Sequence, residues 1–425
     1  MIPDIPPHQN VGFISTRLAG TDGVTLETWK WADIFKEEGF SCFYFAGELE
    51  TPPECSYLCE KAHFSHPVIV DIFENCFGVR VRGRYITQLI HRVKEEIKDH
   101  LYTFIQKFDL DMLVVENALA IPMNLPLGIG LAELIAEIGI PVIGHHHDFF
   151  WERERFLTNS VWEYLNMAFP PHLSQIRNVV INSSADNQVS LRTGISSTVI
   201  PNVMDFENPP LPPDDYTQNV RKDLGIADDE LFILQPTRVV QRKGIEHAIE
   251  LVSRLERKAK LVISHAAGDE GMEYYERVKD FSERMGVTTV FASDIINDQR
   301  GTLPDGRKKY TLDDIYPYAD LVTYPSNFEG FGNAFLEAIY YRRPIAVNRY
   351  SIYTTDIKPK GFSVIEINGF VTQKTVDHTR RVLDDADYRH RMVTHNYDVA
   401  KRYYSYSVLR QKLKTIITDC VGYQF

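Results

Sequence analysis

The sequence predicts an α/β protein made of two doubly wound domains, each with a parallel sheet. Short apolar and β-branched runs alternate with helix-length segments along the chain. Continuous apolar strands between helices are typical of parallel sheets covered on both faces. A proline-rich segment at 200–215 interrupts the alternation, which restarts at residue 231. Prolines favour extended, irregular backbone, so this segment is expected to be the linker.

The individual elements follow from local periodicity. In the first half we expect strands at 10–15, 41–45, 111–116, 141–144 and 178–182, with a helix over 24–40. In the second half we expect strands at 231–235, 260–264, 288–291 and 320–323, and a helix from Gly244. The expected domains are 1–204 and 205–395. A helical segment, 396–425, is free to pack back on the N-terminal domain.

Composition excludes several classes of protein. The 425 residues are 44% hydrophobic and 24% charged, as in ordinary globular proteins. A net charge of −12 argues against nucleic acid or anionic membranes as partners. No apolar run reaches the roughly 18 residues that span a bilayer, and the N-terminus lacks the features of a signal peptide. Five scattered cysteines indicate reduced thiols in a cytoplasmic protein.

Two carboxylates bracket a glycine loop in the second half. Glu329 and Glu337 stand eight residues apart, and Gly330 and Gly332 flank Phe331 between them. The loop lies where a predicted strand turns into a predicted helix. Glycine lets backbone N–H groups approach a ligand, helix N-termini attract phosphate, and carboxylates accept hydrogen bonds from hydroxyls. This pattern predicts a site for a nucleotide sugar.

A basic loop follows the first strand of the second half. Arg238 and Lys243 lie five residues apart at the entry to a helix, where they can neutralise a diphosphate. Taken alone, the segment could equally be a helix start with surface charges. Its position relative to the glutamate motif favours the diphosphate.

A glycine loop, from Gly20 to Gly23, follows the first strand of the chain. It can hold a phosphate on backbone N–H groups, although it matches neither the Walker pattern nor G-x-G-x-x-G. The alternative is a tight turn in which Thr21 or Asp22 caps the next helix.

Polar residues also follow the predicted strand at 141–144. Of three consecutive histidines, at most two could share a metal ion, because neighbours in extended chain point to opposite sides. We expect no metal. We expect His147, beside Asp148, to donate a hydrogen bond to a sugar hydroxyl or a phosphate. Downstream, Arg153 and Arg155 belong either to a solvated helix start or to a clamp for an anionic acceptor.

In combination these segments resemble glycosyltransferase family 4, whose members are retaining nucleotide-sugar transferases with a twin-Rossmann fold called GT-B. The resemblance covers essentially the whole chain. The family's E-x7-E motif appears as Glu329 to Glu337, and its diphosphate-binding pair appears as Arg238 and Lys243. The other matches, in chain order, are the loop from Gly20 to Gly23, His147-Asp148, and an interdomain signature at 200–205 in which Val203 and Met204 replace the usual glycine and valine.

The resemblance implies roles for the matched positions. It assigns Glu337 to the ribose hydroxyls of the donor, and Arg238 and Lys243 to the leaving diphosphate. It places His147 near the reacting bond. The donor-binding set further includes Gly20, Gly23, Glu329 and the N–H groups of Gly330, Phe331 and Gly332, while Asn182 and Ser183 help to shape a cleft between the domains.

The expected reaction moves a hexose from a nucleoside diphosphate to an acceptor hydroxyl with retention of configuration. Two cations and the loop N–H groups stabilise the leaving diphosphate, so neither a metal nor another cofactor is expected. Segments 12–24 and 146–153 resemble family members that make compatible solutes. This favours GDP-mannose as donor, then UDP-glucose, and a small anionic acceptor such as glucosylglycerate, held by Arg153, Arg155 and Asp148.

Three other functions stay open: a transferase that builds lipopolysaccharide or another envelope glycan, a sugar-nucleotide epimerase, and a silent sugar-nucleotide-binding protein. The acidic net charge argues against the first, for which the basic helix at 84–99 is the one candidate membrane surface. The E-x7-E motif argues against the second. The expected partners are small molecules, without nucleic acid or integral membrane association, and a homo-oligomer is compatible with the sequence.

Overall fold

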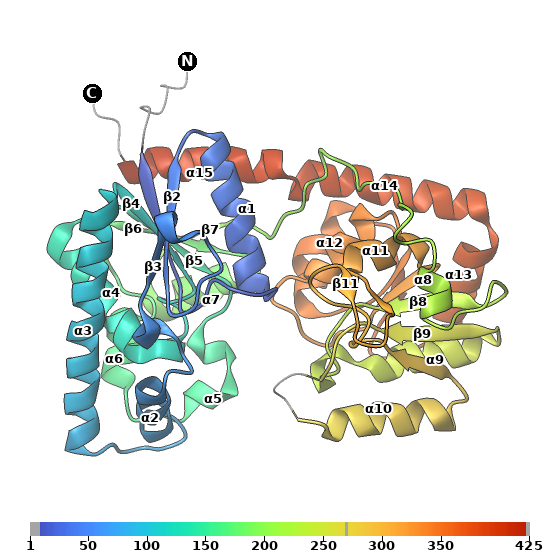
Figure 1. The fold of residues 1–425 in the computed structure, drawn as a ribbon, viewed down its shortest axis with the longest axis horizontal. Helices are drawn as coiled ribbons and strands as arrows, with labels where there is room; N and C mark the ends of the chain where they lie inside the picture. Colours follow the sequence, from blue (N-terminus) through green and yellow to red (C-terminus); the bar gives the residue numbers. More distant parts are fainter. Residues whose placement is uncertain (1–8, 268–270, 422–425) are drawn as a thin grey trace. The chain divides into compact units, whose positions relative to one another are not determined.

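The computed structural model of the protein describes residues 9–267 and 271–421. These residues form two compact units, each built around a parallel sheet (Figure 1). Unit 1 contains the described residues up to Asn202 together with those from Tyr406 onward, and unit 2 runs from Val203 to Ser405. The predicted fold class is confirmed.

Unit 1 contains a seven-stranded sheet in the order β3-β2-β1-β4-β5-β6-β7, with every neighbouring pair parallel. The central strands are buried on both faces, as their unbroken apolar sequences predict. The strands are β1 (Asn10–Ile14), β2 (Ser41–Ala46), β3 (Ser56–Leu58), β4 (Met112–Glu116), β5 (Val142–His146), β6 (Ile176–Val180) and β7 (Ser197–Val199).

Helices cover both faces of this sheet. On one face, α2 (Pro67–Cys76), α3 (Arg84–Phe108), α4 (Leu125–Ile138) and α6 (Trp162–Ala168) pack against one another over the largest apolar core of the unit. The other face carries α1 (Gly23–Glu37), α7 (Ser183–Thr193) and α15 (Tyr406–Val421) (Figure 1). A short α5 (Glu154–Leu157) precedes α6.

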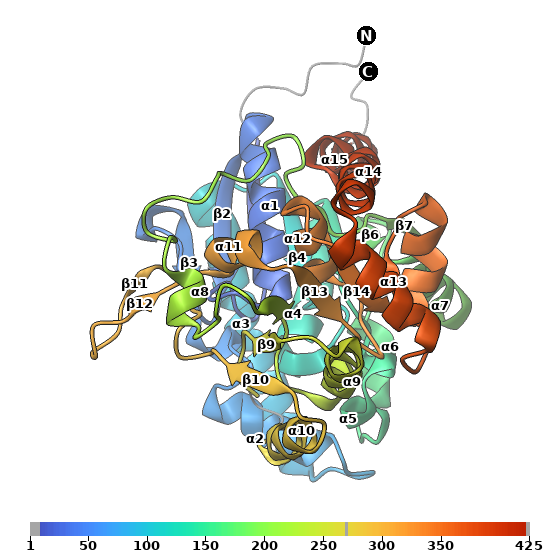
Figure 2. The same ribbon diagram turned by 90° about the vertical axis from the view of Figure 1, so that its right-hand side faces the viewer.

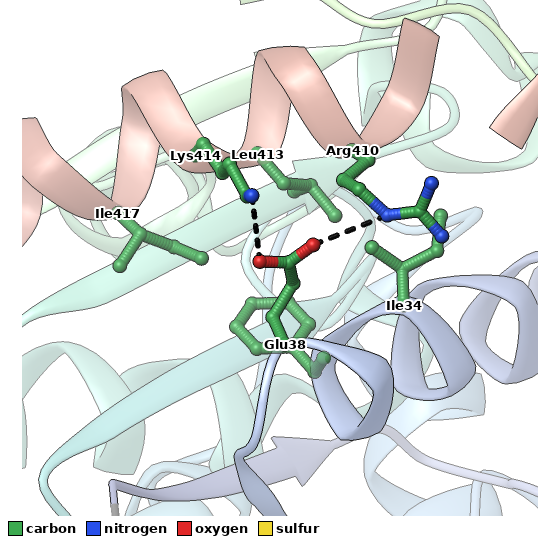
Figure 3. Close-up of a pocket in the computed structure, with 7 residues that line it drawn as sticks. Ile34, Glu38, Arg410, Leu413, Lys414 and Ile417 are labelled. Carbon is green, nitrogen blue, oxygen red and sulfur yellow. Dashed lines mark ion pairs between the residues drawn. The ribbon is translucent and has the colours of Figure 1, made fainter. Parts of the chain in front are cut away.

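The C-terminal helix α15 returns to unit 1 and packs along α1. Leu413 is buried between the two helices, beside Ile34 (Figure 3). Glu38, which ends α1, receives an ion pair from Arg410 Nε at 3.1 Å and another from Lys414 Nζ at 2.8 Å. Apolar contact and charge pairing therefore both tie the end of the chain to this unit.

Unit 2 contains a six-stranded parallel sheet in the order β10-β9-β8-β13-β14-β15. A two-stranded antiparallel ribbon, β11 with β12, lies outside this sheet. The strands are β8 (Leu231–Gln235), β9 (Ala259–Ile263), β10 (Thr288–Phe291), β11 (Gly301–Thr302), β12 (Lys308–Lys309), β13 (Leu321–Tyr324), β14 (Ile345–Asn348) and β15 (Ile365–Ile367).

The helices of unit 2 pack as a row of neighbours. In this row α10 contacts α9, α9 contacts α13, α13 contacts α14, and α14 contacts α12 (Figure 2). The helices are α8 (Val220–Asp223), α9 (Ile245–Leu255), α10 (Glu273–Arg284), α11 (Leu312–Ile315), α12 (Asn333–Tyr340), α13 (Gln373–Asp384) and α14 (Ala386–Tyr404).

The division between the units differs by a few residues from the expected boundaries. The chain leaves unit 1 after Asn202, where a boundary at 204 was expected. The expected terminal segment at 396–425 is split, because α14 belongs to unit 2 through Tyr404 and α15 belongs to unit 1. Both helices are amphipathic, and their sequences alone do not distinguish which sheet each one covers.

Within the described ranges, no helix combines the length and apolar character needed to span a membrane.

Replacement of Leu413 by alanine is expected to lower the free energy of unfolding of unit 1 by about 3 kcal/mol, because it removes a buried side chain between two helices. All four tryptophans (Trp29, Trp31, Trp151 and Trp162) lie in unit 1, so their fluorescence during urea unfolding reports on this unit. Gln411→Ala, at an exposed position of the same helix, is the matched control. Equal stability of the two variants would show that α15 does not contribute to this unit.

Candidate functional site

The sequence-predicted site residues fall into two groups, one in each unit. In unit 2 they lie on the loops that follow β8 and β13, which are neighbouring strands at the centre of the sheet. Both strands run the same way, so their carboxyl ends and the loops beyond them meet at one edge. This edge is where ligands bind in open parallel sheets.

A close backbone contact joins these two loops. Gly244, which begins α9, has φ +58°, and a Cβ at this position would lie 2.6 Å from the carbonyl oxygen of Pro325. The N–H of Asn327 donates to the carbonyl oxygen of Arg242 at 2.8 Å. Glycine is therefore required where the loop after β8 touches the loop after β13.

An ion pair between Lys243 and Glu329 crosses the same contact. Each residue is only 8% exposed, and Lys243 Nζ donates directly to Glu329 Oε1. Arg242 Nη1 approaches the other carboxylate oxygen at 3.3 Å. Burial alone would raise the pKa of Glu329, but Lys243 and its other partners outweigh burial and hold that pKa below its usual range.

Positive charge exceeds negative charge around this pair. Burial lowers the pKa of Lys243, Glu329 raises it, and the nearby guanidinium groups of Arg242 and Arg238 lower it further. Two cationic side chains thus contact one carboxylate, and a third, Arg238, lies close enough to act on Lys243. Arg238 is exposed, whereas the lysine is buried. Such a cluster favours a ligand with two or more negative charges.

The loop after β13 turns sharply into α12 at Gly332. Gly332 has φ +119°, and a Cβ there would lie 2.5 Å from Tyr350 Oη. Tyr350 in turn donates to the carbonyl oxygen of Phe331 at 2.8 Å, which fixes the turn that starts α12. No side chain caps α12 at Gly332. An uncapped helix N-terminus beside cations is suited to an anion.

Glu337 lies in the second turn of α12, at an intermediate level of exposure. Its Oε2 accepts a hydrogen bond from Tyr316 Oη at 2.7 Å. The tyrosine ring is buried and stacks on Tyr341 at 5.0 Å, so the hydroxyl that holds the carboxylate is itself fixed. The structure brings Glu329, Lys243 and the start of α12 together, as the sequence predicts.

In unit 1, the three consecutive histidines divide between the two faces of the sheet. His145 lies beside Glu116 of β4 in the strand register, and its Nδ1 is 2.9 Å from Glu116 Oε2. His147, two residues further on, points the same way, with Nε2 3.3 Å from the same oxygen. His146 points to the opposite face, where Nε2 is 2.9 Å from Asn178 Oδ1.

Glu116, His145 and His147 are the one group of three metal-binding side chains in the described residues with ligand atoms within 4.8 Å of one another. In each imidazole, the nitrogen that faces Glu116 lies within hydrogen-bond distance of Oε2, at 2.9 Å for His145 and 3.3 Å for His147. Burial alone would raise the pKa of Glu116, but the two imidazoles outweigh burial and lower it to about 2. We therefore interpret the group as a carboxylate with two imidazole donors.

The two arginines proposed for the acceptor differ in their surroundings. Arg153 is paired with Asp148, whose other oxygen accepts from Asn117 Nδ2 at 2.9 Å. Arg155 is exposed, lies over the ring of Phe156 at 4.8 Å and has no carboxylate partner in the described part of the chain. Burial and the adjacent Arg153 lower its pKa. Arg155 is thus the guanidinium available to an external carboxylate.

The loop after β1 has the form of the capped turn. Asp22 accepts from the N–H groups of Val24 at 3.0 Å and Thr25 at 3.1 Å, and it pairs with Arg17. Gly20 has φ +73° and donates its N–H to Glu50 at 3.0 Å. A phosphate at Gly20 or Gly23 would therefore have to compete with two carboxylates. Similarly, Asn182 caps α7 at Ser183 by accepting from the N–H of Ala185 at 2.8 Å.

Sequence reasoning missed two residues at the end of β4. Glu116 looks like the last residue of a strand, and only its pairing with β5 places it beside two histidines. Asn117 has φ +60°, a conformation uncommon outside glycine. Its Oδ1 accepts from the N–H of His147 at 3.0 Å. The sequence signal that could have revealed these residues is a strand that ends in Glu-Asn before a turn, because asparagine tolerates a positive φ.

Comparison with known proteins identifies the class. Anabaena HepE, solved in complex with UDP-glucose, has the same fold, with a TM-score of 0.64 at 14% identity over 97% of this chain and 100% of that one. With its two parallel-sheet units, this chain has the GT-B fold. No protein-family model matches the sequence.

Two characterised relatives specify the family. The mannosylglucosylglycerate synthase of Petrotoga mobilis is 32% identical over 380 residues, which is 84% of this chain and 86% of that enzyme. The mannosylglucosylglycerate synthase of Thermotoga maritima is 28% identical over 417 residues, 90% of this chain and 94% of that enzyme. The chain therefore belongs to the glycosyltransferase family of the mannosylglucosylglycerate synthases, and the resemblance to glycosyltransferases is confirmed.

The buried His146 is expected to make unit 1 sensitive to acid. Burial lowers the pKa of His146 to about 4, whereas the unfolded chain binds the proton near pH 6.5. Neutral His146 therefore contributes about 3 kcal/mol to the free energy of unfolding above pH 6.5, and this contribution is lost as the pH falls towards 4.

The free energy of unfolding from tryptophan fluorescence, measured between pH 7.5 and 4.5, tests this expectation. His146→Gln can keep a hydrogen bond to Asn178 but cannot titrate, so its profile should be flatter than that of the wild type. Parallel profiles would contradict a neutral buried His146.

Proposed function

We propose that the protein transfers mannose from GDP-mannose to glucosylglycerate with retention of configuration, through chemistry that needs no metal ion. The names of the two relatives support the donor sugar and the acceptor class. UDP-glucose is the next donor to consider. A cytoplasmic location belongs to the proposal and is supported by five cysteines that are all unpaired.

One observation carries the proposal: the buried Lys243–Glu329 pair at the uncapped start of α12. A diphosphate at this point would meet Lys243, Arg238 and the N–H groups of Gly330, Phe331 and Gly332. Glu329, released in part from Lys243 by the phosphate, would accept from sugar hydroxyls. Glu337, four residues into α12, would accept from the ribose hydroxyls.

The cations serve the departure of the diphosphate. As the bond from the sugar C1 to the phosphate oxygen breaks, negative charge grows on that oxygen, and fixed cations in a partly buried site stabilise it. The acceptor oxygen forms the new bond to C1 on the same face, and its proton passes to the leaving phosphate oxygen. This route requires no carboxylate base, and Glu329 is already engaged by two cations.

On the acceptor side, Arg155 is the proposed partner for the glycerate carboxylate. A guanidinium binds a carboxylate through two parallel hydrogen bonds, and Arg155 has no internal carboxylate to satisfy it. Asp148 and Arg153 satisfy each other, so their proposed part is to hold this segment in place and to accept from or donate to acceptor hydroxyls.

A donor and acceptor assay tests the function. The protein is incubated with GDP-mannose, UDP-glucose or ADP-glucose and with glucosylglycerate, in chelator or in magnesium. We expect one product, from GDP-mannose, whose anomeric configuration by NMR matches that of the donor, formed at equal rate in both buffers. An inverted product, or a rate that disappears in chelator and returns with magnesium, would contradict the mechanism.

The same assay separates the alternatives. Transfer only to a lipid-linked acceptor, added as a further substrate, would favour the envelope-glycan transferase, and release of sugar to water would separate an active enzyme from a silent sugar-nucleotide-binding protein. Interconversion of donor sugars would indicate an epimerase.

Arg238→Ala should lower turnover by about 100-fold or more, because it removes a cation proposed to stabilise the leaving diphosphate. The stability of the protein should not change, because the side chain is exposed. Arg284→Ala, at an exposed arginine of α10, is the matched control.

Glu337 and Arg155 should affect opposite substrates. Glu337→Gln removes a charged acceptor from the ribose site and should weaken GDP-mannose binding by about 10-fold, with an unchanged KM for glucosylglycerate. Arg155→Ala should raise the KM for glucosylglycerate by a similar factor and leave donor binding unchanged, as measured by calorimetry. With the uncharged analogue glucosylglycerol, Arg155→Ala should behave as the wild type. An equal effect of Arg155→Ala on both acceptors would contradict the proposed role of Arg155 in binding the glycerate carboxylate.

A further inference from the structure

Glu116 is a buried carboxylate to which the sequence assigns no role. It ends β4, and its side chain is fully enclosed. One oxygen, Oε2, lies 2.9 Å from His145 Nδ1 and 3.3 Å from His147 Nε2, while Oε1 has no hydrogen-bond partner within the described residues. A charge this deeply buried is costly unless it is paired, so the two imidazoles are needed to keep it.

The carboxylate determines where the two rings carry their protons. An ionised carboxylate can only accept hydrogen bonds, so each nitrogen that faces it must be a donor. His145 therefore carries a proton on Nδ1, and His147 carries one on Nε2. The two rings, two residues apart on one strand end, are held in opposite tautomers by one oxygen.

Neighbouring groups fix the rings in this arrangement. Trp31 of α1 stacks on His145, with centroids 4.1 Å apart and planes at 21°. Asn117, in its strained backbone conformation, accepts from the N–H of His147. His145 is 1% exposed at its side chain and His147 is 10% exposed. The Nδ1 of His147 has no partner within the part of the chain that the structure describes, so it is the ring atom left for a substrate.

We propose that Glu116 is a positioning residue for sugar transfer: it fixes the ring of His147 with its proton on Nε2 and so presents the unprotonated Nδ1 to a substrate hydroxyl, as a hydrogen-bond acceptor in place of the donor expected from the sequence. The proposal rests on the proposed function, because it assigns to His147 the contact with substrate. His145 also donates to this carboxylate. Because its ring is stacked on Trp31, its role is to hold the carboxylate in place. Removal of the carboxylate would let His147 change tautomer and turn.

The first test is made on the wild type and needs no substrate. Two-dimensional ¹H–¹⁵N spectra of the histidine rings distinguish the two tautomers, and His145→Asn and His147→Ala assign the signals. We expect His145 protonated on Nδ1 and His147 on Nε2 in the full chain. A wild-type His147 protonated on Nδ1 alone would overturn the proposal, as would a stoichiometric metal, detected by elemental analysis, whose removal changes these signals.

The second test is kinetic. Glu116→Gln keeps the size of the side chain and should lower kcat by about 10- to 100-fold, the range found when the outer partner of a functional histidine is lost, while both KM values change less than about 3-fold. In a His147→Ala background the same change should have no further effect on kcat. His172→Asn, at an exposed position of unit 1, is the matched control and should keep kcat within about 3-fold of the wild type.

The outcomes separate the two proposals. If the losses in kcat from Glu116→Gln and His147→Ala are additive as free energies, Glu116 acts on the fold and not through His147. That result would overturn the positioning role. A wild type that transfers no sugar from any donor would refute the proposed function. The NMR spectra would then still test the positioning role. If the Nε2-protonated form of His147 is present in the wild type and lost in Glu116→Gln, then Glu116 fixes the tautomer of His147.

Discussion

The buried ion pair between Lys243 and Glu329 is the contact on which the unit 2 site depends. It joins two loops that are far apart in sequence, and the backbone contact at Gly244 makes the joining possible. Loss of Glu329 would leave the buried charge of Lys243 without compensation, at a cost of about 3–5 kcal/mol, whereas loss of Lys243 would leave Glu329 with Arg242 as its partner. With Arg242 and Arg238 close by, the pair also leaves an excess of positive charge that an anionic ligand can neutralise.

Unit 1 also contains a buried, paired carboxylate, but its partners are imidazoles, which are weaker bases than lysine. Glu116 is enclosed like Glu329, and its charge is kept by imidazoles where Glu329 has a lysine and an arginine. In both units the buried carboxylate lies at the carboxyl end of a strand near the middle of its sheet. The pairing positions side chains that otherwise would rotate freely, so each site is rigid before substrate arrives.

Much of the fold and part of the site could be predicted because they depend on local patterns. The strand at 288–291 was predicted residue for residue, and the strand before Glu329, expected at 320–323, was predicted within one residue. The short edge strands β3, β7 and β15 were not predicted, because three residues carry too little periodicity. Glu116 was missed because it looks like the last residue of an apolar strand, and the two histidines beside it lie 29 and 31 positions away in the sequence.

The sequence by itself determined the alternation of strands and helices, the linker, and the residue types that favour a phosphorylated, hydroxyl-rich ligand. These depend on backbone preferences and on side-chain chemistry over a few residues. Only the tertiary structure decided which strands are neighbours, that Arg153 is paired while Arg155 is available, that Asp22 caps the first glycine loop, and which sheet each terminal helix covers. Those outcomes depend on contacts between residues far apart in the chain, because burial and charge pairing are set by whichever groups the fold brings within a few ångströms.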